Sequence, residues 1–305
     1  MKIVYAGSPE FSVPALKALC NAENCEVIAV ITQPDKPVGR KQILTPTPVK
    51  AFAEEIGIQV YDFKKICEHV EEIKALGADI MITCAYGQIL TQEVLDCFPK
   101  GVWNLHASLL PKFRGASPIQ SAILTGESYT GITVMKTELA LDSGDILLVK
   151  RCEIGGKTCG ELSAELSSLA ADAAVDAVKY LNEGGVQLLM QDETGVSFCK
   201  KIQKSDCKIN FSKTAEEVLR VIKAFSPSPA AYCNLNGAIL NILNADMAEG
   251  SGKCGEVIAC DKLGITVACG NNAVRITLLQ PAGGKVMPAR DFVNGRKIKA
   301  GDILD

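Results

Sequence analysis

Hydrophobic residues in the first third of the chain fall into short runs that alternate with amphipathic stretches. The runs are almost continuously apolar, which is typical of parallel strands covered on both faces, and the stretches between them follow the helical period. This alternation predicts an open, mostly parallel, twisted α/β sheet, whose ligands lie beyond the carboxyl ends of the strands. The predicted strands are Lys2–Ala6, Glu26–Thr32, Ile58–Tyr61, Asp79–Thr83 and Val102–His106, and the predicted helices are Ser12–Ala22, Pro48–Ile56, Glu68–Leu76 and Thr91–Cys97.

The last third of the chain has a different pattern, in which short β-type segments are separated by glycine turns. A long helix over Thr158–Leu181, with a capping box of Thr158 and Glu161, precedes the change. An amphipathic helix over Ala215–Phe225 begins the new region, and short strands at this spacing predict a small β-barrel. We therefore expect domains at 1–190 and 208–305, joined by a polar linker over 191–207; the predicted barrel strands are Ala231–Leu235, Ala238–Leu243, Gly255–Ala259, Ile265–Ala268 and Ala273–Leu278.

The stretch from Val102 to Leu148 carries the candidate chemistry. Alternation along its first strand places Asn104 and His106 on the same face. A segment that ends in proline follows, and then a helix with Ser117 as its N-cap and proline at its first position. A second strand is predicted over Thr130–Met135.

Asp142 follows that strand in a tight turn that contains glycine. Together with the amide of Asn104 and the imidazole of His106, its carboxylate can help to polarise a carbonyl, move a proton and hold the imidazole in one protonation state. Each of the three residues also has an ordinary structural use when taken alone. The chain has only two histidines, His69 and His106, so a mechanism based on histidine has few candidates.

The order Asn104-x-His106, Ser108-Leu109-Leu110-Pro111 and then Asp142 within LDSGD resembles the signature of the folate-dependent formyltransferases. The resemblance extends over nearly the whole chain. The segment from TQPDKP to TPTPVK and the C-terminal block narrow it to members that formylate methionyl initiator tRNA. It implies a Rossmann-like catalytic domain and a smaller, OB-like C-terminal β-barrel domain. The segments that carry it are IVYAGSPEF, TQPDKPVGR, TPTPVK, AYGQIL, QDET and LQPAGGKVMPARDF.

The resemblance also implies a reaction: transfer of the formyl group of 10-formyltetrahydrofolate, without a metal ion, to the free amino group of methionyl initiator tRNA. His106 would handle a proton and contact the oxyanion, Asn104 would hydrogen-bond the formyl oxygen, and Asp142 would orient and support His106. The folate-binding residues that it implies are Ser108, Leu109, Leu110, Pro111, Tyr86, Gly87 and Ile89.

A long loop is expected over 33–50, with four prolines and several basic residues. Long loops are often functional, and basic side chains suit a phosphate backbone. The resemblance implies that this loop engages the tRNA acceptor arm through Arg40 and Lys41. Members of the family commonly have Gly-Lys-Lys after the arginine, whereas this chain has Lys41-Gln42-Ile43.

Charge is unevenly distributed along the chain. Residues 200–305 carry a balance of +5 and residues 1–199 a balance of −8, within a net charge of −3. A basic C-terminal part suggests an anionic partner. Its candidate contacts with the nucleic-acid backbone are Lys204, Lys208, Arg296, Lys297 and Lys299.

Composition sets the remaining expectations. No apolar run reaches the roughly 18 residues of a membrane-spanning helix, and the start of the chain has the pattern of a strand instead of a signal peptide. The 13 cysteines show no C-x-x-C spacing, so we expect small buried thiols in a reducing compartment. We therefore expect a cytoplasmic monomer that binds folate and tRNA and has no membrane partner.

Other functions stay open at this point. The same folate site could serve a different acceptor, such as an amino sugar or a purine precursor. Water could replace the acceptor, which would make the chain a hydrolase of the formyl donor. A nucleic-acid-binding protein with an inactive catalytic half is a further alternative, against which the intact set of Asn104, His106 and Asp142 argues.

Overall fold

The computed structural model describes residues 1–39 and 41–305. These residues form two compact units, and each unit is made of three segments of the chain. Residues 191–199, the first part of the predicted linker, belong to the first unit. Unit 1 comprises Met1–Gly115, Thr130–Glu153 and Ser163–Cys199, and unit 2 comprises Ala116–Tyr129, Ile154–Leu162 and Lys200–Asp305.

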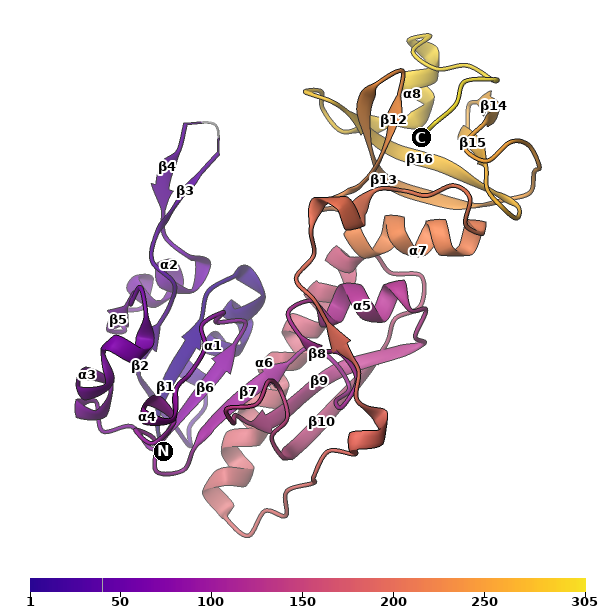
Figure 1. Ribbon diagram of the computed structural model, residues 1–305. Helices are drawn as coiled ribbons and strands as arrows, with labels where there is room; N and C mark the ends of the chain where they lie inside the picture. Colours follow the sequence, from indigo (N-terminus) through magenta and orange to yellow (C-terminus); the bar gives the residue numbers. More distant parts are fainter. Residues whose placement is uncertain (40) are drawn as a thin grey trace. The chain divides into compact units, whose positions relative to one another are not determined.

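Unit 1 is built on a seven-stranded sheet in the order β10-β9-β7-β6-β1-β2-β5 (Figure 1). The pairs β1–β2, β1–β6, β2–β5 and β6–β7 are parallel, and β7–β9 is antiparallel. The predicted open, mostly parallel α/β sheet is therefore confirmed. The strands are β1 Lys2–Gly7, β2 Glu26–Ile31, β5 Val60–Tyr61, β6 Ile80–Cys84, β7 Val102–His106, β9 Tyr129–Lys136 and β10 Ile146–Glu153.

The central strands are buried on both faces, as their continuous apolar sequences predict. In β1, Ile3 and Tyr5 point to one face and Val4 and Ala6 to the other, and all four are fully buried. Val4 and Ala6 share a hydrophobic cluster with Ile73 from one of the helices. The helices are α1 Val13–Cys20, α2 Pro48–Glu55, α3 Val70–Ala75, α4 Gln92–Leu95 and α6 Cys159–Glu183, with 3-10 turns at Glu10–Ser12, Ile66–Glu68 and Glu193–Gly195.

Two local expectations for this region need correction. The segment over 33–50 is not an irregular loop, because β3 (Lys36–Val38) and β4 (Ile43–Thr45) pair as an antiparallel hairpin that projects from the sheet (Figure 1). The predicted helices at 68–76 and 91–97 are shorter, at Val70–Ala75 and Gln92–Leu95. The capping box at the start of α6 is confirmed, since the Thr158 backbone N–H donates to the Glu161 carboxylate at 2.8 Å.

Unit 2 contains an antiparallel sheet in the order β12-β13-β16-β15-β14, with β17 paired to β16. The predicted smaller C-terminal β domain is confirmed. Its core combines the strands with the apolar side of α7, where Val218, Ile222 and Phe225 are buried. The elements are β12 Ala231–Leu235, β13 Ala238–Ala248, β14 Val257–Asp261, β15 Gly264–Ala268, β16 Ala273–Pro281, β17 Met287–Pro288, α5 Pro118–Leu124, α7 Ala215–Phe225, α8 Ala289–Asn294 and a 3-10 turn at Lys204–Cys207.

The two outer strands of this sheet, β12 and β14, are linked by the last residues of the chain. Leu304 forms a bridge with Leu235 of β12, and Ile303 forms one with Glu256, next to β14. The Asn234 backbone N–H donates to the Asp305 carbonyl at 2.7 Å, and that of Val257 donates to the Asp302 carbonyl at 2.8 Å. Backbone groups at both edges are thus paired, as in a closed barrel.

Ser117 occupies the N-cap position of α5, as predicted, but its hydroxyl has another partner. It donates to the backbone carbonyl of Lys200, so it connects α5 to the start of the C-terminal segment. Among the described helices, none is both long and apolar enough to span a membrane.

Candidate active site

Asn104 and His106 lie at the carboxyl end of β7, and the neighbouring strands supply a threonine beside each of them. Thr83 of β6 is opposite Asn104, and Thr133 of β9 is opposite His106. The parallel β6–β7 pair brings the carboxyl ends of both strands to the same edge of the sheet, where ligands bind in open α/β folds. The sheet register therefore places both candidate residues where the sequence predicted them.

The amide of Asn104 has a defined orientation. The Thr83 hydroxyl donates to Asn104 Oδ1 at 2.9 Å. With Oδ1 on the Thr83 side, the Nδ2 group is a hydrogen-bond donor without a partner among the described residues. Asn104 can thus offer an N–H to a carbonyl oxygen of a substrate.

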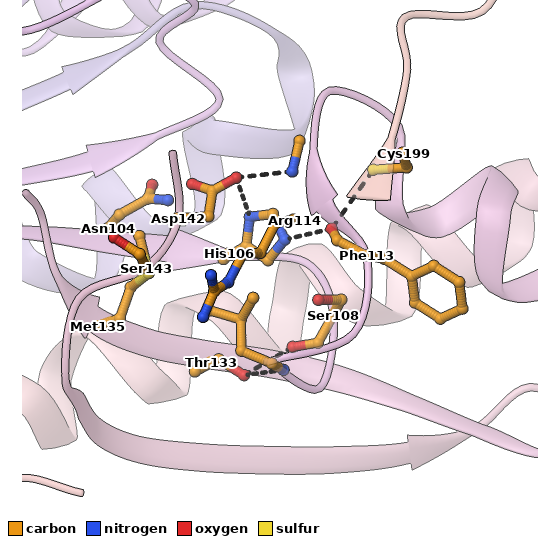
Figure 2. Close-up of polar contacts among 12 residues, drawn as sticks. Asn104, His106, Ser108, Phe113, Arg114, Thr133, Met135, Asp142, Ser143 and Cys199 are labelled. Carbon is orange, nitrogen blue, oxygen red and sulfur yellow. Dashed lines mark hydrogen bonds and ion pairs between the residues drawn. The ribbon is translucent and has the colours of Figure 1, made fainter. Parts of the chain in front are cut away.

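The imidazole of His106 is buried, with 6% of the residue exposed, and both ring nitrogens face oxygen atoms (Figure 2). Nε2 lies 2.9 Å from the backbone carbonyl oxygen of Phe113. Because a carbonyl oxygen only accepts, Nε2 carries a hydrogen, and Nδ1 is the nitrogen that can take up a proton. Nδ1 faces Asp142 Oδ2 at 3.7 Å, so a protonated ring pairs with that carboxylate.

Asp142 is held by the backbone of a separate segment. Its Oδ2 accepts a hydrogen bond of 2.8 Å from the Gly115 backbone N–H. Gly115 has φ +124°, and a Cβ at this position would lie 2.2 Å from the carbonyl oxygen of Cys199, so only glycine fits here. Asp142 itself has φ +48°, within the turn that the sequence predicted. The structure therefore brings the imidazole and the distant carboxylate together.

The Ser108–Pro111 segment lies directly after β7 and is fixed by Thr133. The Thr133 hydroxyl donates to the Ser108 carbonyl at 2.7 Å and accepts from the Leu110 N–H at 3.2 Å. The Ser108 hydroxyl donates to the Lys112 carbonyl at 2.6 Å, and Leu110 packs with Met135 in a small buried cluster. The Leu109 and Pro111 side chains are partly exposed.

The second predicted folate segment, around Tyr86, is divided between core and surface. The Tyr86 side chain is buried in a hydrophobic cluster, its hydroxyl has no partner in the described parts of the chain, and burial raises the pKa of the phenol. Its carbonyl accepts from Gln33 Nε2 at 3.2 Å. Gly87 adopts φ +80°, and Ile89 is 89% exposed. Surface for a ligand in this segment comes from Gly87 and Ile89, not from the tyrosine ring.

Of the two predicted tRNA-binding residues, Lys41 is exposed in the turn of the hairpin. Arg40 lies outside the described residues. Lys36 of β3 adds a second exposed ammonium to this hairpin.

Sequence analysis missed the residues that hold the site together. The carbonyl of Phe113 and the N–H of Gly115 contact His106 and Asp142, but backbone groups leave no signal in a side-chain pattern. Gln191 was noted only within QDET, as part of a family resemblance. Its Nε2 donates to the Asp142 carbonyl at 2.9 Å and to the Gly144 carbonyl at 2.8 Å.

Comparison with known proteins gives this geometry a family. The formyl transferase profile matches residues 1–178, and the formyl transferase C-terminal domain profile matches residues 201–297. A methionyl-tRNA formyltransferase of Macrococcus caseolyticus is 43% identical over 97% of this chain and 96% of its own length. One of Neisseria meningitidis is 42% identical over the full length of both chains. The chain belongs to the methionyl-tRNA formyltransferase family.

The fold agrees with this assignment. An N-formyltransferase from Helicobacter canadensis, solved with folinic acid and dTDP-3-aminofucose, superposes with a TM-score of 0.69 at 19% identity, covering 90% of this chain and 99% of that chain. At this identity the likeness concerns the fold alone. Methionyl-tRNA formyltransferases are folate-dependent enzymes, so membership of the family makes the chain a folate-dependent formyltransferase, as the sequence motifs indicated.

Proposed function

We propose that this chain transfers the formyl group of 10-formyltetrahydrofolate to the amino group of methionyl initiator tRNA, and that Asn104, His106 and Asp142 carry the reaction. The observation that supports this most directly is the pair of oriented groups at the end of β7. Asn104 presents a free N–H donor, and His106 presents a proton-accepting nitrogen beside a carboxylate. Full-length relatives at 42–43% identity support the choice of acceptor.

The formyl donor, when bound, supplies an electrophilic carbonyl carbon and a nitrogen leaving group. The Asn104 amide fits this group, because its Nδ2 is a donor that Thr83 has already oriented. A hydrogen bond from Nδ2 to the carbonyl oxygen strengthens as that oxygen gains negative charge. Asn104 thus favours attack at the carbonyl carbon without having to reorient.

His106 and Asp142 manage the proton. The attacking amine must lose one proton, and the leaving nitrogen must gain one, so the site has to hold a proton between the two steps. Nδ1 of His106 can take it up, because the Phe113 carbonyl keeps the other ring nitrogen protonated. The Asp142 carboxylate, 3.7 Å away, stabilises the imidazolium that results.

We assign folate contacts to Ser108–Pro111 and to the exposed part of the Tyr86–Ile89 segment. Both follow strands of the parallel sheet at the edge that carries Asn104. We assign tRNA contacts to the hairpin, through Arg40 and Lys41, and to the C-terminal domain. In the C-terminal domain, the candidate side chains are Lys204, Lys208, Arg296, Lys297 and Lys299. The ammonium of Lys204 lies 6.0 Å from the ring centroid of Tyr232, and that of Lys297 lies 5.8 Å from the ring centroid of Phe292.

A formyl-transfer assay with labelled 10-formyltetrahydrofolate tests this function, with methionylated initiator tRNA and an amino-sugar nucleotide as separate acceptors. We expect transfer to the tRNA only. His106→Ala should lower kcat by about 10²–10⁴-fold, because it removes the proton-handling group.

The only other histidine gives a matched control. His69 stacks on Phe63 and pairs with Glu72, and we have placed it in no catalytic role. His69→Ala should change kcat less than about twofold. Near-normal turnover by folded His106→Ala would refute the catalytic assignment, and transfer to the amino sugar instead of the tRNA would refute the acceptor.

A further inference from the structure

The side chain of Gln191 uses all of its hydrogen-bonding capacity inside unit 1. Its Nε2 donates to the backbone carbonyls of Asp142, at 2.9 Å, and Gly144, at 2.8 Å. Its Oε1 accepts from Arg114 Nε at 3.1 Å and from Arg114 Nη2 at 2.8 Å. An amide has two donor hydrogens and two acceptor lone pairs, so each has a partner here.

The two groups that Gln191 joins are the ones that hold the proton-handling pair. The Asp142 turn carries the carboxylate that faces His106. Arg114 stands between Phe113, whose carbonyl bonds the imidazole, and Gly115, whose N–H bonds the carboxylate. The Gln191 amide therefore links the backbone of the Asp142 turn to the segment 113–115, which hydrogen-bonds both His106 and Asp142.

The burial of Arg114 explains why its bond to Gln191 matters. Arg114 is only 5% exposed, so its guanidinium depends on fixed partners. Among the described residues its partners are the Gln191 amide and the Glu193 carboxylate, the latter at 2.8 Å, and the Glu193 side chain is 73% exposed to solvent. Gln191 is the partner that also reaches the Asp142 turn.

We propose that Gln191 is a positioning residue for formyl transfer, which sets the distance between the Asp142 carboxylate and His106 Nδ1 and does not itself touch the substrates. This inference rests on the proposed function of the His106–Asp142 pair. Misplacing a catalytic group by about 1 Å can cost on the order of 10²-fold in rate, so a residue outside the reacting centre can carry a large kinetic effect.

The informative substitution is Gln191→Glu. The carboxylate still accepts from Arg114, but it cannot donate to the Asp142 and Gly144 carbonyls, and it places an oxygen against them. We expect kcat for formyl transfer to fall about 10–100-fold, with the KM for 10-formyltetrahydrofolate within about threefold of wild type. Gln59→Glu is the matched control, because Gln59 is an exposed amide of unit 1 that donates to the Val60 backbone carbonyl, and its kcat should stay within about twofold.

A double-mutant cycle with Asp142→Asn separates positioning from a general structural role. If Gln191 acts through the carboxylate, Gln191→Glu should lower kcat less than about twofold in the Asp142→Asn background. An equal loss in both backgrounds would show that Gln191 acts independently of Asp142 and would overturn the proposal. Gln191→Met, which removes the donors without adding charge, should show the same dependence on Asp142.

Thermal unfolding of each variant completes the test. Failure of both Gln191 variants to fold would make Gln191 a general structural residue and overturn the proposal. If Asp142→Asn alone keeps the wild-type kcat, the catalytic role of the pair is wrong. If Asp142→Asn is slow but Gln191→Glu is not, only the positioning role fails.

Discussion

The carboxyl end of β7 and the β3–β4 hairpin belong to the same unit but follow opposite rules. At the end of β7, polar side chains are buried or half-buried and bonded to backbone or to one another. On the hairpin, apolar side chains are exposed, with Ile43 and Leu44 at 61% and 67%. Chemistry on a small carbonyl requires groups fixed before the substrate arrives, whereas contact with a macromolecule requires accessible surface.

The base of the hairpin resembles the end of β7, because its polar side chains are paired with one another. The exposed apolar side chains lie farther along the hairpin. The hydroxyls of Thr32 and Thr47 are 2.6 Å apart across the base. Lys50 pairs with Asp35 at 2.9 Å and with Asp62 at 2.8 Å, and these partners raise the pKa of its ammonium. The exposed residues are thus carried on an anchored stem.

Of the three substitutions that test this comparison, the one that removes a preorganised donor should have the largest effect. Asn104→Ala should lower kcat by about 10²–10³-fold, because the carbonyl oxygen loses its hydrogen bond as charge develops. Steady-state formyl transfer at saturating tRNA measures this effect. A loss confined to the KM for tRNA would instead place Asn104 in the acceptor site and would remove the contrast between the two regions.

A smaller effect is expected from the residue that orients this donor. Thr83→Val keeps the shape of the side chain but removes the hydroxyl that fixes Asn104 Oδ1. We expect kcat to fall about tenfold, which is typical of a supporting hydrogen bond in a site. In an Asn104→Ala background the same substitution should have little further effect, and a full tenfold loss there would show that Thr83 acts by another route.

The smallest effect should come from the hairpin, and it should be of a different kind. Lys41→Ala should raise the KM for tRNA about two- to fivefold, leave kcat unchanged and reduce the salt dependence of tRNA binding by about one phosphate contact. Lys74→Ala, at an exposed lysine of α3, is the control. A fall in kcat at saturating tRNA would mean that the hairpin belongs to the catalytic machinery.

The same contrast explains what could be predicted from sequence. β7 was predicted with its observed bounds, and Asn104 and His106 stand at its end because strand alternation and sheet direction follow from the apolar pattern. Asp142 was a candidate as a carboxylate in a tight, glycine-containing turn. Its position beside His106 could not be predicted from this pattern, since a turn after a strand does not by itself indicate its spatial neighbours.

The partners of these residues were beyond such reasoning. The groups that hold His106 and Asp142 are a carbonyl at Phe113 and an N–H at Gly115, and every residue other than proline has both. The hairpin was taken for a loop because its two strands have only three residues each and lie within a segment that contains four prolines, so neither strand shows a periodic pattern. Ser117 was expected to cap its helix, but tertiary contact with Lys200 determined its hydrogen bond.

Residues 301–305 join β12 and β14, the two outer strands of the C-terminal sheet, through hydrogen bonds of their backbone. Gly301 donates to the carbonyl of Val257 in β14 and Leu304 to that of Gly255 just before it, while Asp305 exchanges hydrogen bonds with Asn234 of β12. Deleting these residues would uncover two strand edges at once, and uncovered edges are templates for aggregation.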